Sequence, residues 1–396
     1  MMFKKYVLAV LLAAGFSVTA MAQDACCVDK PSSVQVYGRL DVGIVNANSV
    51  QNSAGQTAGI TQVTSSPMYT SHIGFKATEK LSGQTEVYAR IESQINPADG
   101  SQGISSSSAA ANGVFAREAN IGIVNKEIGT FIIGRQVNPA YQAWSQTDVR
   151  GPFSFGSSLV YQSDGSSFGG TSTAKTGIST YTGGSYISNA VSYITPDYNG
   201  LKGVLLYGSG NVAGDTDYNQ KTAIAAVYDK GMFTGTTGYQ NTRSSTTGGI
   251  TGRYWWVGGG IRPTDKSLVK VGYTVFENPM TKDANAANSQ WSLTAISGEY
   301  KLTERVKAWA GYYMMNDEIN SANKNTMKSF GTEYELSKRT QVYTAVSFVE
   351  NQGTAGWAGY GGGGANYSSL NTTTFASSIG QGKSQTAYTV GMVHRF

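Results

Sequence analysis

Apolar and polar residues alternate along most of the chain after residue 33, in segments of about nine to twelve residues. In the first such segment Val34 and Val36 share one face, while Gln35 and Tyr37 share the other. Alternation with a period of two is typical of a β-strand whose two faces meet different surroundings. The pattern therefore predicts an all-β protein.

We count sixteen such segments, of which 201–209 and 220–228 alternate poorly and are placed by spacing alone. The predicted strands lie at 33–46, 70–79, 84–95, 114–125, 130–136, 187–195, 201–209, 220–228, 231–241, 252–262, 267–277, 289–300, 305–315, 326–336, 340–350 and 385–396. Short turns alternate with longer loops at 47–69, 96–113, 210–219, 278–288 and 351–384. An even strand number with this asymmetry is typical of outer-membrane barrels. We therefore expect a transmembrane antiparallel β-barrel with both termini on the periplasmic side.

The connection at about 137–186 has no strand alternation and differs from the other loops in its side chains. It contains aromatic residues and acids: Tyr141, Trp144, Phe153, Phe155, Tyr161, Asp148 and Asp164. A loop that is long and rich in such residues is usually functional or disordered. We expect it to fold inward, as the third long loop of the barrel, and to narrow a pore.

The first residues predict export from the cytoplasm. Lys4 and Lys5 precede an apolar run at 7–18, and small residues follow at 20–22, as in a secretory signal peptide cleaved before Gln23. The apolar run is too short to span a membrane, and no later run is long enough for a transmembrane helix. We expect the mature barrel domain at 23–396, with Cys26 and Cys27 in a terminal tail of little structural role or in a link to another chain.

Composition agrees with a barrel and excludes some partners. Hydrophobic residues make up 40% of the chain and charged residues only 14%, and the 24 Tyr outnumber the 14 Phe. A barrel with a wet lumen needs one apolar face per strand and Tyr at the membrane interfaces. Without residues 1–22 the chain has 28 basic and 25 acidic residues, a bias too weak to suggest nucleic acid.

Three segments resemble the Gram-negative porin family, in particular its sixteen-stranded trimeric general porins. They are VQVYGRLDVGI at 34–44, FAREANIGIVNKEIGTFIIGRQ at 115–136 and YTVGMVHRF at 388–396. The resemblance implies a homotrimer in the outer membrane of a Gram-negative bacterium, in contact with lipid and lipopolysaccharide. It implies a water-filled channel for passive diffusion of small hydrophilic solutes and ions. The terminal Phe396 looks like the signal that the barrel-assembly machinery reads.

Strand parity places cationic side chains in the lumen. Arg39, Lys76 and Arg90 lie on the polar faces of the first three strands, close enough to form one cationic wall. Arg117 and Arg135 are further candidates. Parity alone turns Arg135 outward, but the matching GRQ segment of the porin family places it in the lumen, and Gly134 would permit a bulge that turns it inward.

The resemblance places the acids of the third loop, here Asp148 and Asp164, opposite this wall. Cations facing acids across a narrow lumen create a transverse field, and an excess of cations favours anions. We therefore predict weak to moderate anion selectivity. The alternative is that these cations are ordinary solvated residues, paired with Glu86, Glu92 or Glu118.

Other functions were weighed against the pore. The two histidines, His72 and His394, have no neighbouring nucleophile motif, so we expect no enzyme, and no metal site or cofactor. A substrate-specific channel for sugars or organic acids would need an aromatic track, to which Trp144, Phe153 and Phe155 are the candidates. A secreted adhesin would also alternate along its strands, but the terminal strand and the rhythm of turns and loops argue against it. The Gly-rich stretch 351–364 is expected to be a flexible surface loop.

Overall fold

The computed structural model describes residues 32–51, 57–103, 113–151, 155–157, 186–243, 249–278, 289–353 and 382–396. The expected signal peptide, Cys26, Cys27, Asp164 and nearly all of the Gly-rich stretch lie outside the described residues. The described part belongs to one unit, Ser32–Phe396.

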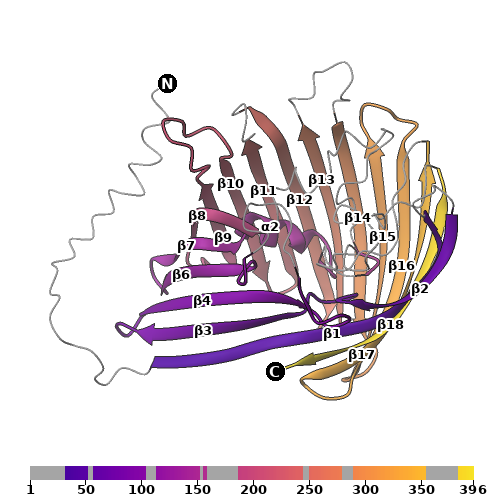
Figure 1. Cartoon of the computed structure of the whole chain (residues 1–396), viewed down its shortest axis with the longest axis horizontal. Helices are drawn as coiled ribbons and strands as arrows, with labels where there is room; N and C mark the ends of the chain where they lie inside the picture. The colour runs from indigo at the N-terminus through magenta and orange to yellow at the C-terminus, as the bar shows by residue number, and fades with distance from the viewer. Residues whose placement is uncertain are drawn as a thin grey trace. The chain divides into compact units, whose positions relative to one another are not determined.

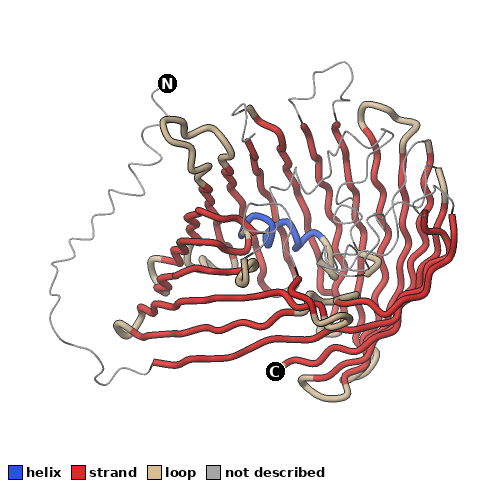
Figure 2. The backbone as a smooth tube through the Cα atoms, in the orientation of Figure 1, coloured by secondary structure: helices blue, strands red, loops and turns tan. Residues whose placement is uncertain are grey.

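Nearly all regular structure in the described residues is β-strand (Figure 2). The strands are β1 (Ser32–Gln51), β2 (Thr57–Ser65), β3 (His72–Lys80), β4 (Thr85–Asn96), β5 (Ser101–Gly103), β6 (Glu118–Asn125), β7 (Gly129–Val137), β8 (Tyr186–Ile194), β9 (Leu201–Gly208), β10 (Lys221–Lys230), β11 (Phe233–Arg243), β12 (Ile250–Thr264), β13 (Ser267–Asn278), β14 (Ser289–Lys301), β15 (Val306–Asp317), β16 (Lys324–Glu335), β17 (Thr340–Gln352) and β18 (Ser384–Arg395). Two short helical pieces, α2 (Pro139–Trp144) and η1 (Ser145–Thr147), follow β7. No helix in this part of the chain is long and apolar enough to cross a membrane.

Sixteen strands form a closed antiparallel ring (Figure 1). The ring runs from β3 through β4 to β6, and then strand by strand in chain order to β18. The first strand, β1, pairs with β18 on one edge and with β3 on the other, which closes the barrel. The predicted sixteen-stranded barrel is therefore confirmed, and each predicted strand corresponds to one member of the ring.

Two additional strands lie where the sequence predicted only loops, at 47–69 and 96–113. The strand β1 is 20 residues long and extends past its last pairing with β3 at Arg39. Its far half leaves an open edge, and β2 pairs with that edge from Val42 to Gln51. The three-residue β5 pairs with the end of β4 in a similar way. Both strands therefore pair with the part of a wall strand that continues past its neighbour in the ring.

The two faces of the wall differ as the alternation predicted. Apolar side chains such as Val34 and Ile133 are 77% and 62% exposed on the outer face. Polar side chains such as Gln240 and Ser329 are buried on the inner face. An apolar exterior around a polar interior is the arrangement of a barrel that spans a membrane around water.

The chain terminus closes the seam between the first and last strands. The backbone N–H of Phe396 donates to the carbonyl of Gly38, and that of Gly38 donates to the carbonyl of Phe396, both at 3.1 Å. A Cβ atom at Gly38 would lie 2.6 Å from Cζ of the Phe396 ring. The glycine therefore leaves the space in which the terminal ring lies against the first strand.

A bulge at Gly134 resolves the parity of Arg135. The pairing of β7 with β8 shifts register between Gly134 and Gln136, and Gly134 has a φ of +118°, which favours glycine. Arg135 and Gln136 are consequently both buried on the inner side. The bulge expected from the sequence is present and brings the guanidinium of Arg135 inward.

Candidate pore constriction

Cationic side chains inside the barrel gather over three tyrosine rings. Each of these rings, Tyr69, Tyr88 and Tyr186, has at least two cationic groups within 6 Å of its centroid. Cations are attracted to the negative face of an aromatic ring at such distances. The five cations predicted for the wall all belong to these groups: Arg39, Lys76, Arg90, Arg117 and Arg135.

The ring of Tyr88, on β4, carries two cations from the middle of β3 and β4. Lys76 Nζ lies 5.0 Å and Arg90 Cζ 5.3 Å from the ring centroid. Lys76 forms an ion pair with Glu86 at 3.7 Å, and Arg90 forms one with Glu118 at 3.1 Å. The side chains of Lys76 and Arg90 remain 28% and 31% exposed, so both cations face the lumen while paired.

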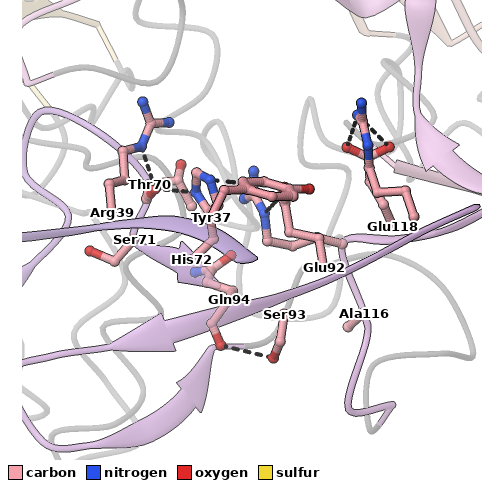
Figure 3. A network of polar contacts seen from close by, with 12 residues as sticks. Tyr37, Arg39, Thr70, Ser71, His72, Glu92, Ser93, Gln94, Ala116 and Glu118 are labelled. Carbon is pink, nitrogen blue, oxygen red and sulfur yellow. Dashed lines mark hydrogen bonds and ion pairs between the residues drawn. The ribbon is translucent and has the colours of Figure 1, made fainter. Parts of the chain in front are cut away.

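The ring of Tyr186, at the start of β8, lies between Arg117 and Arg135. Their guanidinium carbons are 5.0 Å and 5.9 Å from its centroid. Arg117 forms a buried ion pair with Glu92, which also accepts the hydroxyl of Tyr37 at 2.9 Å (Figure 3). The Glu92 carboxylate thus contacts both Arg117 and Tyr37, and its negative charge neutralises the positive charge of Arg117.

Polar contacts hold the bulged Arg135 in place. Its Nε donates to the carbonyl of Ala116 at 2.6 Å, and its Nη1 donates to Ser188 Oγ at 2.6 Å. These contacts fix the guanidinium beside Tyr186 and account for its low exposure.

The ring of Tyr69 lies among three arginines. The guanidinium carbons of Arg39, Arg150 and Arg395 are 5.3, 5.8 and 5.5 Å from its centroid. The Tyr69 hydroxyl donates to Glu333 Oε2 at 3.1 Å, and Arg150 forms an ion pair with the same carboxylate. Tyr69 therefore reaches from the turn before β3 to β16.

The buried carboxylate of Asp41 positions Tyr69. It accepts the backbone N–H groups of Met68 and Tyr69 at 2.8 and 2.6 Å, and the hydroxyl of Tyr343 at 2.6 Å. Charge-assisted hydrogen bonds of this kind are short and strong. They fold the turn after β2 inward against β1.

Arg39 and Arg395 are neighbours across the seam and differ from the other cations. They are register partners on β1 and β18. Arg39 donates its Nε to the carbonyl of Thr70 at 2.9 Å, and its two Nη atoms point away from this contact (Figure 3). Arg395 donates its Nη2 to Gln341 at 3.0 Å. Neither arginine has an ion pair with any described residue.

The described start of the connection after β7 runs along the inner wall from β11 to β16. Its contacts are Asn138 with Gln240 at 2.7 Å, Trp144 with Thr274 at 2.8 Å, Val149 with Ser297 at 3.0 Å, Asp148 with Tyr313 at 2.8 Å, and Gly156 with Ser329. The backbone N–H of Phe155 also donates to the carbonyl of Pro67 at 2.8 Å. These hydrogen bonds hold the described residues 138–151 and 155–157 inside the ring, with α2 within it (Figure 2).

Asp148 does not take the place that the sequence predicted. Its side chain is 3% exposed and accepts the Tyr313 hydroxyl and the backbone N–H of Arg150. The acid is therefore directed at β15 and not at the cations of β1, β3 and β4. The donors at β15 and in the loop backbone satisfy the buried carboxylate there.

Two of the arginines lie in connecting segments, outside the strands. Burial lowers the pKa of the Arg150 guanidinium, but Glu333 raises it by more, so the pKa is above its ordinary value. Burial likewise lowers the pKa of Arg117, while Tyr186 and Glu92 raise it by more. Both groups are therefore cationic at neutral pH.

The sequence alone did not identify Arg395, Arg150 or the rings of Tyr69, Tyr88 and Tyr186 as parts of this site. Arg395 shares a face with Thr389 and Val393, both buried, so the parity of the last strand was a usable signal. Arg150 and Tyr69 lie in irregular segments, where parity gives no direction.

The two histidines lie on β3 and β18. His72 Nδ1 lies 2.9 Å from the carbonyl of Thr70, and its Nε2 lies 3.9 Å from Glu92 (Figure 3). His394 is exposed and contacts Thr340 on the outer side of β18. In the described ranges no group of three or more His, Cys, Asp and Glu side chains could hold a metal ion.

A closed ring of strands with an apolar outer face and a charged, hydrated interior is a membrane channel. A sequence model of the Gram-negative porins matches residues 8–354. The chain therefore belongs to the Gram-negative porin family, and it forms an outer-membrane channel for passive diffusion of small hydrophilic solutes and ions.

Individual relatives agree in length and fold. The chain is 23% identical over 408 residues to the outer membrane porin protein 32 of Delftia acidovorans, with 98% of each chain covered. Its fold is similar to that of an anion-selective porin from Comamonas acidovorans, with a TM-score of 0.71, 19% identity, and coverage of 92% of this chain and 100% of that one. It is also similar to the OmpT protein of Vibrio cholerae in its trimer form, with a TM-score of 0.60, 14% identity, and coverage of 92% and 99%.

Proposed function

We propose that the channel is weakly to moderately anion-selective and that the cations over the three tyrosine rings cause this preference. The observation that carries the proposal is the pair Arg39 and Arg395. Each uses one guanidinium nitrogen for a neutral oxygen, and neither meets a carboxylate in the described parts of the chain. Neither guanidinium has an ion-pair partner among these residues, so their charge attracts anions entering the lumen.

The other wall cations contribute less net charge. Lys76, Arg90 and Arg117 pair with Glu86, Glu118 and Glu92, which are the partners that the alternative interpretation anticipated. A paired cation still orients a dipolar solute, but its long-range field is reduced by its partner. This division supports a moderate preference rather than a strict one. Arg135 is proposed to add to it through the bulge at Gly134.

The constriction is proposed to lie within the connection 137–186, of which residues 152–154 and 158–185 are outside the described part of the chain. The inner position of residues 138–151 and 155–157 supports this, because chain packed against one wall leaves less open cross-section. With Asp148 turned away, the field at this point depends on the cationic wall and on carboxylates paired with it.

The channel is further proposed to work as a homotrimer made from a precursor whose residues 1–22 are removed. In their described residues, the outer faces of β1, β3, β4, β6 and β7 expose aliphatic side chains and Phe75, but no Tyr or Trp. Strands from β10 to β18 instead expose Tyr228, Trp255, Tyr273, Tyr300, Tyr334 and Tyr388. Tyr and Trp are enriched where protein meets a lipid headgroup region, so the first face suits a neighbouring subunit. Lipopolysaccharide is the proposed neighbour of the second face.

Phe396 is proposed to serve as the signal for the barrel-assembly machinery. Its ring is 44% exposed at the seam, where the last strand has to close on the first.

A substrate-specific channel is less well supported. Trp144 and Phe155 are each 1% exposed and packed against the wall, so they supply no aromatic track along the lumen. The third candidate for such a track, Phe153, lies outside the described residues. An adhesin is less well supported still, because the charged interior would have no role in it.

The test is the reversal potential of the purified protein in a planar bilayer across a KCl gradient. We expect conductance steps in threes and a potential of anionic sign. The variant Arg39→Ala/Arg395→Ala should lower the permeability ratio of chloride to potassium about two-fold, which corresponds to about 0.4 kcal/mol. The variant Arg305→Ala, in an exposed turn, serves as the control and should retain the wild-type ratio. A potential of cationic sign in the wild type would refute the proposed selectivity.

A further inference from the structure

Large aromatic side chains on the inner face lie flat over glycines of the neighbouring strand. In each case the aromatic residue and the glycine are direct register partners: Tyr37 with Gly74, Tyr88 with Gly122, Trp256 with Gly238, Trp309 with Gly331, and Tyr343 with Gly391. A Cβ atom built at any of these glycines would lie between 2.2 and 2.4 Å from the nearest atom of the partner aromatic side chain. The glycines therefore leave the space that lets the rings lie against the wall instead of standing up into the lumen.

The pair Tyr88 and Gly122 differs from the others because both cations over its ring are exposed to the lumen. Lys76 Nζ and Arg90 Cζ lie 5.0 and 5.3 Å from the ring centroid, and Tyr88 itself is buried beneath them. Three layers are thus stacked from the wall toward the pore, namely the glycine backbone, the tyrosine ring and the two cations. Trp309 also carries a cation, Arg150 at 4.6 Å, but that arginine is buried.

We propose that Gly122 and Tyr88 are positioning residues for ion selectivity, in that the ring, lying flat over the glycine, holds Lys76 and Arg90 at the lumen surface. This inference rests on the proposed anion preference and specifies how two cations contribute to it. The same arrangement sets the free cross-section beside them, because a ring that lies flat occupies the least lumen.

The physical reason is that the Tyr88 ring and the neighbouring carboxylates both attract the two cations. Each is within ion-pair distance of a carboxylate, at 3.7 Å for Lys76 with Glu86 and 3.1 Å for Arg90 with Glu118. The ring face provides a second favourable contact that keeps each cation from folding fully onto its acid. Without the ring in that position, the cations turn to their carboxylates and less of their field reaches the lumen.

A single methyl group at Gly122 tests the stack. In Gly122→Ala the new Cβ would lie 2.3 Å from Cε1 and Cζ of Tyr88. These atoms are the far end of a flexible side chain, so we expect the ring to tilt into the lumen while the strand pairing persists. We therefore expect lower single-channel conductance and an approximately two-fold lower ratio of chloride to potassium permeability, the size of about one lost cation–π contact at an exposed site.

Further variants separate the ring from the glycine. Tyr88→Phe keeps the ring and should keep both wild-type values. Tyr88→Ala removes the platform and should lower the permeability ratio without lowering the conductance. In Gly122→Ala/Tyr88→Ala no ring remains to be displaced, so the conductance should return to that of Tyr88→Ala while the ratio stays low. Gly298→Ala is the matched control, because its Cβ meets no atom closer than 3.6 Å.

The outcomes are distinct from those that test the proposed function. Unchanged conductance and ratio in Gly122→Ala, or an unchanged ratio in Tyr88→Ala, would overturn the positioning role. A double variant with the low conductance of Gly122→Ala would show that the ring is not what narrows the pore. A cationic reversal potential of the wild type would instead refute the anion preference, and the order of conductances would still test the stack.

Discussion

The two sides of the barrel differ in length and in what covers their inner faces. On one side, β3, β6, β7 and β8 have 8 or 9 residues and β4 has 12, and on the other side β11–β17 have 11 to 15. Figure 1 shows β3, β4, β6 and β7 at the left and β11–β16 in the middle and at the right. We refer to β3, β4, β6, β7 and β8 as the short side, and to β11–β17 as the tall side.

The inner face of the tall side is filled by the chain itself. Trp144 of α2 packs edge-on against Tyr254 and Phe276, and Tyr254 stacks on Trp256. The inner face of the short side instead carries charged side chains over tyrosine rings, with Lys76 and Arg90 open to the lumen. The difference shows that one wall holds the inserted segment in place while the other presents charge to solutes.

The largest expected effect concerns the packed side and uses two adjacent tryptophans of β12. Trp256 is fully buried in the aromatic cluster, and Trp255 points to the outer face. Trp256→Ala leaves a cavity beneath α2 and should lower the free energy of unfolding by about 3–5 kcal/mol. The measurement is the shift of the heat- or denaturant-induced transition followed by electrophoretic mobility of the folded barrel.

Trp255→Ala is the matched control, with an expected loss of about 1 kcal/mol or less because no cavity forms. Equal losses in the two variants would show that the tall side is not distinguished by internal packing.

A smaller effect is expected from the bulge on the short side. In Gly134→Ala a non-glycine residue would have to adopt a φ of +118°, with its Cβ 2.5 Å from the carbonyl oxygen of Ala119. Such strain costs about 1–3 kcal/mol, so we expect the bulge to shift and Arg135 to lose its contacts with Ala116 and Ser188. The reversal potential should then move toward the cation side.

Gly259→Ala controls for this change, because its Cβ has 3.7 Å to the nearest atom. If Gly134→Ala and Gly259→Ala gave the same reversal potential as the wild type, the bulge would have no part in selectivity.

The alternating pattern predicted most of the wall strands, because a wall between lipid and water favours a period of two. Segments that alternate poorly, such as 201–209 and 220–228, were placed by spacing alone. The pattern did not reveal β2 or β5, which pair only because neighbouring wall strands end earlier or bend. Whether a strand extends past its neighbour depends on the pairing of segments distant in sequence.

Site residues were predictable to the extent that they lie on strands. Parity directed Arg39, Lys76 and Arg90 inward, and Gly134 marked the exception that turns Arg135. Asp148 lies in an irregular segment, where parity gives no direction, and its carboxylate accepts the hydroxyl of Tyr313, which is 165 residues away in the sequence. Its part in the constriction stays a prediction. Asp164 and its role remain a prediction.

The contrast between an open cationic side and a filled opposite side is tested most directly by the accessibility of introduced cysteines. Lys76→Cys and Asp148→Cys would each be made in a chain in which Cys26 and Cys27 are replaced by serine. A negatively charged, water-soluble thiol reagent is added to the open channel. It should modify the cysteine at position 76 as fast as the reagent mixes with the solution, and it should reduce the anion current. Position 148, 3% exposed against Tyr313, should react far more slowly and leave the current unchanged. Fast modification at position 148, or none at position 76, would contradict the assignment of the two sides.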